Sequence, residues 1–176
     1  MILAGYIFSA INYLFYCVGR FTKKKPAILM FSLVALCMAG ISNYCFGSLT
    51  GSLALFVQIP IVILSYINEK KPLQNWLRCC IYEVAFLLIT LILIFTFQGI
   101  TSILIYIATN LSIYSYWWMD EQGMRIAGIF IGVAFFVYCM SIENYLGFLE
   151  LCVIFANLVS YAIYKNRIKQ INLSKL

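Results

Sequence analysis

The chain contains no histidine and few charged residues. Only 10% of its 176 residues are charged and 64% are hydrophobic, whereas about 25% of the residues in a soluble domain are charged. The lack of histidine excludes His-based zinc sites, Ser–His and Cys–His nucleophilic pairs, and histidine proton relays. Since so few charges cannot cover a water-facing surface, the sequence predicts one integral membrane domain over residues 1–176.

Redox, metal and enzymatic motifs are also lacking. None of the seven cysteines form a C-x-x-C pair, and Cys79 and Cys80 are adjacent, which is poor geometry for a thiol oxidoreductase. We expect the cysteines to act as small hydrophobic side chains within helices. The sequence has no phosphate-binding loop, no paired intramembrane carboxylates and no base for a serine nucleophile. It therefore predicts no enzyme, no cofactor and no metal site.

Long stretches without charge predict seven membrane-spanning helices. A span needs about 20 mostly apolar residues. Residues 27–68 lack any charge, and a single helix of that length would be about 63 Å long, so a break is expected between Gly47 and Gly51. The stretch 84–119 is expected to break at Gln98 and Gly99. The predicted helices cover residues 1–19, 27–46, 52–68, 77–97, 100–119, 126–141 and 146–164.

The basic residues predict how these helices are oriented. With the N-terminus outside, all twelve Lys and Arg residues lie on the cytoplasmic side, four of them in the tail 165–176. This distribution follows the positive-inside rule. It explains the net charge of +6 and makes a nucleic-acid partner unnecessary. The C-terminus is therefore expected to be cytoplasmic.

The helix count favours two parallel three-helix repeats. The first would cover residues 1–68, the second 100–164, and the helix 77–97 would link them in a 3+1+3 plan. An offset of 98 residues aligns Asn12 with Asn110, and also Ala10 with Ala108 and Tyr16 with Tyr114. Many transporters consist of such repeats and bind their solute near the bilayer midplane, between the repeats.

Four amide side chains are predicted near the middle of spanning helices: Asn12, Gln58, Asn110 and Asn157. An amide offers both donors and an acceptor, so the group is interpreted as a binding site for a neutral polar solute. The alternative is that the amides hydrogen-bond between helices and stabilise packing. Pro60, beside Gln58, removes a backbone donor and is interpreted as a hinge.

Two carboxylates are further candidates. Glu150 is expected about one turn inside the outer end of the last helix, and Glu83 about one turn inside the cytoplasmic end of the fourth. A carboxylate within a membrane often binds a proton or a solute, although both side chains could instead reach the interface. Arg125 is expected to pair with Asp120 or Glu121.

Several residues and short motifs have a characteristic placement: Gly5, the basic loop from Arg20 to Lys25, Gly51, Gly123, Met124, Arg125, Gly147, Glu150 and Asn157. Through them, most of the chain resembles the YgjV-type family of small bacterial inner-membrane proteins. This resemblance implies a multi-pass protein of the bacterial inner membrane. The helix plan is more distantly similar to the SWEET, PQ-loop and nicotinamide riboside transporter folds. SWEET proteins bind sugar with an asparagine on the third helix of each repeat; Asn157 lies on such a helix, whereas its counterpart in the first repeat is Ile61.

These patterns predict a small-solute transporter or facilitator that works by alternating access. Its partners would be the lipid bilayer and a small polar solute, and association into a homo-oligomer is left open. The alternative is a membrane receptor, immunity protein or scaffold that transports nothing. A central cavity filled with water favours the transporter, and a dry interface of Leu and Ile between the repeats favours the alternative.

Overall fold

The computed structural model describes the backbone of residues 1–173 and the side chains of residues 1–165. This part of the chain is entirely helical, as the sequence predicts. Arg167, Lys169 and Lys175 of the predicted basic tail lie outside the described side chains. The elements are α1 (Ile2–Arg20), α2 (Lys25–Cys45), α3 (Leu49–Lys70), α4 (Asn75–Phe95), α5 (Ile100–Trp118), α6 (Glu121–Ser141), the 3-10 helix η1 (Tyr145–Leu149) and α7 (Glu150–Leu173).

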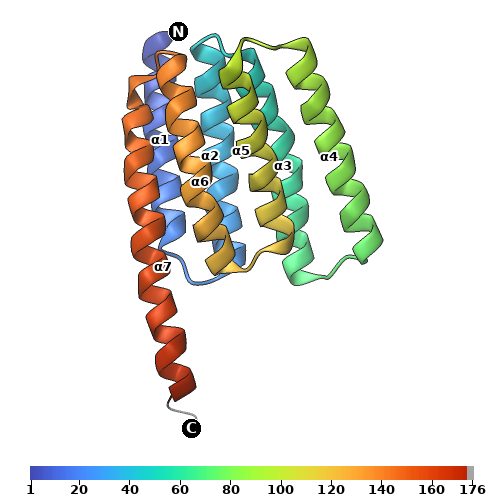
Figure 1. Cartoon of the computed structure of the whole chain (residues 1–176), viewed down its shortest axis with the longest axis vertical. Coiled ribbons are helices and arrows are strands. Elements are labelled where there is room, and N and C mark those ends of the chain that lie inside the picture. Colours follow the sequence, from blue (N-terminus) through green and yellow to red (C-terminus); the bar gives the residue numbers. More distant parts are fainter. Residues whose placement is uncertain (174–176) are drawn as a thin grey trace.

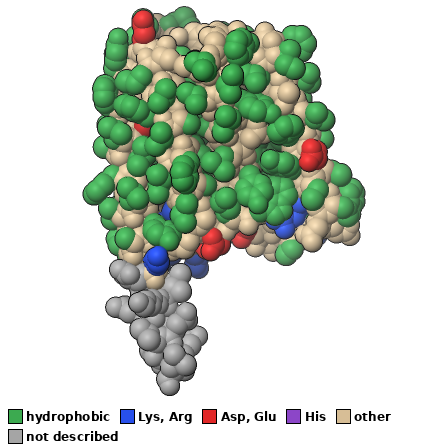
Figure 2. All heavy atoms as spheres, in the orientation of Figure 1, with side chains coloured by type: hydrophobic (Ala, Val, Ile, Leu, Met, Phe, Trp, Pro, Cys, Tyr) green, Lys and Arg blue, Asp and Glu red, His purple; other side chains and the backbone are tan. Residues whose placement is uncertain are grey.

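The helices run up and down between two ends of a bundle (Figure 1). The end that holds the connections 21–24, 71–74 and 119–120 is called the basic end, because the blue Lys and Arg side chains gather there in Figure 2. The opposite end, called the far end, holds the connections 46–48, 96–99 and 142–149. Hydrophobic side chains dominate the face between the two ends (Figure 2), as expected for a surface that contacts lipid.

Six segments of the described chain are long and apolar enough to cross a membrane. They are α1, α2, α3, α4, α6 and the segment Tyr145–Lys165, which joins η1 to α7. Helix α5 has 19 residues and no charge, but it is not among the six because it is richer in Ser, Thr, Asn and Tyr. Several of these polar residues are buried, including Ser102, Thr109, Ser112 and Ser115.

Six helices form a ring and the seventh lies outside it. The ring consists, in order, of α1, α2, α3, α5, α6 and α7. Each of these helices packs against the next, and α7 also contacts α1. Helix α4 contacts α3 and α5 and lies at one side of the bundle (Figure 1). Only Ala85 and Ile89 of α4 are buried, so nearly all of this apolar helix faces away from the ring.

Local sequence signals set the helix boundaries. Gly47 has a positive φ of 78°, which glycine adopts without steric cost, and the Ser48 side chain accepts a hydrogen bond from the Gly51 amide at the start of α3. Asp120 caps α6 in the same way, accepting from the Gly123 amide at 2.7 Å. Helix α6 therefore begins before the predicted residue 126, and Arg125 lies within it rather than in a loop.

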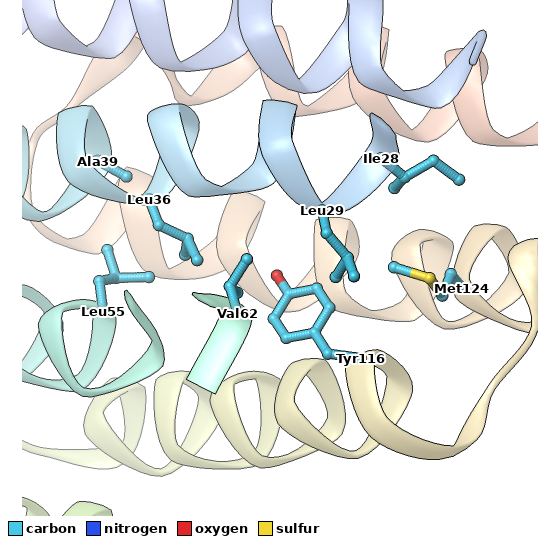
Figure 3. Close-up of a cluster of buried hydrophobic side chains, with 8 residues drawn as sticks. All are labelled: Ile28, Leu29, Leu36, Ala39, Leu55, Val62, Tyr116 and Met124. Carbon is cyan, nitrogen blue, oxygen red and sulfur yellow. The ribbon is translucent and has the colours of Figure 1, made fainter. Parts of the chain in front are cut away.

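A hydrophobic cluster packs α2 and α3 against α5 and α6 (Figure 3). Tyr116 reaches from α5 into the space between α2 and α3. Three members of the cluster, Ala39, Leu55 and Tyr116, also line the cavity described below. The cluster thus provides an apolar wall beside a polar space. Its members are Ile28, Leu29, Leu36, Ala39, Leu55, Val62, Tyr116 and Met124.

Candidate functional site

A polar cavity lies at the centre of the ring. Its walls come from all six ring helices, and within residues 1–165 none of its lining residues belongs to α4. The space open to the centres of water molecules is about 40 Å³, and because one water needs about 10–15 Å³, it admits about three. The polar part of the wall includes Asn12, Tyr13, Arg20, Asn43, Asn144 and Glu150.

Glu150 faces this cavity and is only 6% exposed. A methyl group placed on Gly132 would lie 3.8 Å from Glu150 Oε2, and Gly132 is near the middle of α6. The carboxylate is therefore deeper than the sequence predicts, because η1 takes up residues 145–149 at the far end before α7 begins. As the first residue of α7, Glu150 is also where the helix dipole stabilises a negative charge.

Arg20 is the functional candidate that the sequence analysis missed. It is the last residue of α1 and was placed in the basic loop, yet it is only 5% exposed and lines the cavity. Side chains lean toward the N-terminus of their own helix, so Arg20 leans back into the bundle. Its guanidinium carbon lies 5.6 Å from the centre of the Tyr16 ring, and the C-terminal end of α1 favours its positive charge.

The two charges share the cavity without forming an ion pair. Among the described side chains the ion pair closer than 4.0 Å joins Lys25 to Glu69, at 2.9 Å, and neither Arg20 nor Glu150 takes part in one. Tyr13 also lines the cavity, and its hydroxyl lies 3.6 Å from Cys139 Sγ. The site thus presents one basic and one acidic side chain to the same small cavity.

The four predicted amides do not converge on the cavity. Asn12 lines it, whereas Gln58, Asn110 and Asn157 do not. Asn157 lies directly behind the wall, because a methyl group on the cavity-lining Gly128 would approach Asn157 Oδ1 to 2.8 Å. Gln58 is fully buried in α3, and Asn110 is half-buried on α5.

None of these amides hydrogen-bonds to another helix within residues 1–165. Asn110 and Asn157 each donate to a carbonyl of their own helix, on Tyr106 and Val153, at 2.9 Å. The interhelical packing role considered above is therefore not seen among these residues. Each amide keeps at least one buried polar atom without a protein partner: Asn12 Oδ1, Gln58 Oε1 and Nε2, Asn110 Oδ1 and Asn157 Oδ1.

A substitution at Gln58 tests whether the buried amide atoms lack hydrogen-bond partners, through its effect on the free energy of unfolding. A buried polar group without a partner costs about 1–3 kcal/mol, and both polar atoms of Gln58 lack one. We expect Gln58→Met to raise the free energy of unfolding by about 1–3 kcal/mol, measured by titration with a denaturing detergent. The exposed Gln98 provides the control Gln98→Met, which should have no effect. A destabilised Gln58→Met variant would show that the amide is already hydrogen-bonded, for example to buried water.

Glu83 and Pro60 lie away from the cavity. Glu83 is exposed on α4. Pro60 is exposed on α3 and lines an apolar hollow of about 630 Å³ between α3 and α4. Helix α3 continues through Pro60 from Leu49 to Lys70.

Hydrogen bonds link the two sides of the ring at the far end. The Asn144 amide donates to Ser9 Oγ at 2.9 Å, and Ser9 is 2.7 Å from Ser42 Oγ. The Tyr138 hydroxyl of α6 also bonds to Ser48 at the start of α3. These links join α1–α3 to α5–α7 on this side of the cavity.

A second set of links lies at the basic end. Arg125 is buried, and its guanidinium donates to the carbonyl oxygens of Arg20 at 3.4 Å and Thr22 at 2.8 Å. The predicted pairing of Arg125 with Asp120 or Glu121 is wrong, since neither forms an ion pair with it in the described chain. Arg125 instead links the α1–α2 connection to α6 by hydrogen bonds. It lies in the second turn of α6, where its side chain reaches this connection.

The sequence did contain a signal for the α1 side of the site. Ser9, Asn12, Tyr13, Tyr16 and Arg20 all line the cavity, and their spacing of three or four residues places them on one face of a helix. A polar stripe on an otherwise apolar spanning helix marks the side that faces away from lipid. The contributions of Asn43 and Asn144 carry no comparable signal, because each is an isolated residue near a helix end.

Comparisons with protein-family models, with curated proteins and with solved structures find no match for this chain. The function is therefore inferred from the cavity, from the Arg20 and Glu150 side chains that line it and from the links between helices at each end.

Proposed function

We propose that the chain is a small-solute transporter or facilitator that binds a neutral polar solute in the central cavity. The observation that carries this proposal is a cavity between six helices, with Arg20, Asn12 and Glu150 in its wall. Buried charged and amide groups are costly within a membrane and are typical of solute pathways. The cavity lies between α1–α3 and α5–α7, where transporters built from two repeats bind their solutes.

The proposed topology has seven crossings in a 3+1+3 plan. Helix α5 is the seventh crossing, with Ile100, Ile103 and Ile107 exposed and most of its Ser and Thr residues buried. Helices α1, α2 and α3 pack in sequence, as do α5, α6 and α7, while α4 lies outside the ring, which suits a linker. The basic end would be cytoplasmic by the positive-inside rule, in the bacterial inner membrane, with the N-terminus outside.

Alternating access would break the links at one end while those at the other hold. The Tyr138–Ser48 and Asn144–Ser9 bonds would separate to open the far end. The contacts of Arg125 with the α1–α2 connection would separate to open the basic end. The described conformation, in which both sets of links are formed, would lie between these two states.

A non-transporting receptor, immunity protein or scaffold is the second candidate. The observation that favours it is the cluster of Leu29, Leu36, Leu55 and Val62 between α2, α3, α5 and α6, which resembles a permanently packed interface (Figure 3). The polar cavity beside this cluster favours the transporter.

Uptake into proteoliposomes tests the proposed function. A mixture of small polar solutes should enter vesicles that contain the protein faster than empty vesicles. Asn12→Ala should lower this rate at least about tenfold, because losing hydrogen bonds to a desolvated solute costs about 1.5–3 kcal/mol. The matched control is Asn75→Ala, since Asn75 is exposed at the start of α4. Equal uptake rates in vesicles with and without the protein would contradict the proposal.

Reporter labelling tests the orientation. In intact cells, a membrane-impermeant thiol reagent should modify a cysteine introduced at Gln98 of the far end, in a variant that lacks the native cysteines. A cysteine introduced at Lys71 of the basic end should react only after the membrane is permeabilised. The reverse pattern would place the N-terminus in the cytoplasm.

A further inference from the structure

The central cavity holds two opposite charges that have no ion-pair partner in the described chain. Arg20 is 5% exposed and Glu150 is 6% exposed, and both line the cavity. The Arg20 Nε atom is buried without any hydrogen-bond partner among the described residues. Burial of one charge without a counter-charge is expensive, and burial of two is more so. A ligand in the cavity that contacts both groups would offset this cost.

The chemistry of the two groups restricts what that can be. A guanidinium binds a carboxylate through parallel hydrogen bonds, whereas a carboxylate accepts hydrogen bonds from an ammonium group. A lone anion or a lone cation would satisfy one of the two charges and leave the other buried and unmatched. An uncharged solute would neutralise neither. A molecule that carries both charges satisfies both residues and adds no net charge to the membrane interior.

We propose that the solute is a small zwitterion, with its anionic group against Arg20 and its cationic group against Glu150. This inference rests on the proposed function and names the class of its solute. The Asn12 Oδ1 atom, which has no protein partner within residues 1–165, and the Tyr13 hydroxyl provide further hydrogen-bonding groups in the same wall. A net charge of zero fits the neutral solute proposed above.

The size of the cavity limits the solute to the smallest members of this class. The cavity admits about three waters, which occupy about 90 Å³ in the liquid at about 30 Å³ each. An amino acid with a minimal side chain fills a space of this order in the described conformation. A sugar or a nucleoside would need the helices to separate.

Ligand stabilisation of the full chain in detergent tests the proposal directly. The probes are glycine, β-alanine and 4-aminobutyrate, which separate the two charges progressively, and acetate, methylammonium and acetamide as controls that carry one charge or none. At least one zwitterion should raise the Tm saturably at millimolar concentration, because a ligand that binds only the folded state stabilises it by mass action. The three controls should give no saturable shift. Stabilisation by acetamide equal to that by the best zwitterion, or no shift with any zwitterion, would overturn the proposal.

Charge-removing variants assign the two ends of the ligand. Glu150→Gln should lose the response to the zwitterion and gain one to acetate, since only Arg20 still needs a partner. Arg20→Gln should lose the response and gain one to methylammonium. Glu83→Gln and Lys24→Gln remove exposed charges and should behave as the wild type. If either cavity variant does not fold, the wild-type comparison of zwitterions with single-charge ligands still decides the question. Retention of the full zwitterion response by both folded variants would overturn the assignment.

Counterflow separates this inference from the proposed function. The zwitterion that binds best is loaded into proteoliposomes, and uptake of its radiolabelled form is measured. Binding together with counterflow supports both proposals. Binding without counterflow supports the zwitterion site and overturns transport. If uncharged solutes are taken up in a way that depends on Asn12 and no zwitterion binds, the transport proposal is supported and the zwitterion proposal is overturned.

Discussion

Replacement of Glu150 by glutamine is expected to lower the initial rate of solute uptake at least about 30-fold. Glu150 is buried in the wall of the central cavity, so its carboxylate would contact the proposed solute with little water between them. Loss of one partner from such a desolvated contact costs about 2–5 kcal/mol, and each 1.4 kcal/mol is a factor of ten. The measurement is the initial rate of uptake into proteoliposomes that contain equal amounts of protein.

The matched control for this variant is Glu83→Gln. Glu83 is also a glutamate on a spanning helix, but it is exposed on α4 and does not line the cavity. Its replacement should leave the rate within about twofold of the wild type, because an exposed charge contributes little. Glutamine keeps the size of the side chain and removes a buried charge, so Glu150→Gln should remain folded. Unchanged uptake by folded Glu150→Gln protein would remove Glu150 from the site.

Gly51→Ala is expected to destabilise the far end. A methyl group at Gly51 would overlap the Tyr138 hydroxyl and approach its Cζ atom to 2.7 Å and Asn43 Nδ2 to 2.9 Å. Tyr138 is 2% exposed and has little room to move. Overpacking of this kind costs about 1–3 kcal/mol, and the bond from Tyr138 to Ser48 would be lost as well. We expect the free energy of unfolding to fall by about 2–4 kcal/mol.

A double variant distinguishes this local overlap from a general intolerance of alanine. Tyr138→Phe removes the hydroxyl that the new methyl group overlaps, so Gly51→Ala combined with Tyr138→Phe should cost less than the sum of the two single variants. Neighbouring substitutions that relieve one another show coupling of about 0.5–3 kcal/mol. Strictly additive effects, measured by denaturant titration in detergent, would show that α3 and α6 do not meet at this point.

The helices could be placed from the sequence because their ends are marked locally. The break expected between Gly47 and Gly51 was found, since α2 ends at Cys45, Gly47 has a positive φ and α3 begins at Leu49. The break at Gln98 and Gly99 precedes α5 at Ile100. Helix α6 begins at Glu121 and not at the predicted residue 126, because the Asp120 side chain caps it. These features depend on a few neighbouring residues, which the sequence displays directly.

The site was harder to predict because it depends on which way each helix faces. Depth follows from counting residues along a helix, and by this count four amides lie near mid-membrane. Only Asn12 reaches the cavity wall, because the rotation of each helix about its axis is set by packing against its neighbours. The depth of Glu150 was misjudged for a different reason, since η1 precedes α7. Arg20 was assigned to a loop because charge at a helix end normally indicates the interface.

The peripheral position of α4 did have a sequence signal. Its 21 residues include few polar side chains after Glu83, which is typical of a helix that contacts lipid on most of its surface. Helix α5 shows the opposite pattern, with Ser, Thr and Asn along its length and most of them buried. Comparison of these two neighbouring helices would have separated the one outside the ring from the one within it.

The central claim is that solutes reach the cavity between α1–α3 and α5–α7 from both faces of the membrane. Cys139 offers a native reporter, because it is 4% exposed and lines this cavity. With the other six of the seven cysteines replaced by alanine, a small charged thiol reagent should modify Cys139 when added from either side of oriented vesicles. A solute that binds should slow both reactions. No labelling from either side before the protein is denatured would contradict transport and favour a permanently closed scaffold.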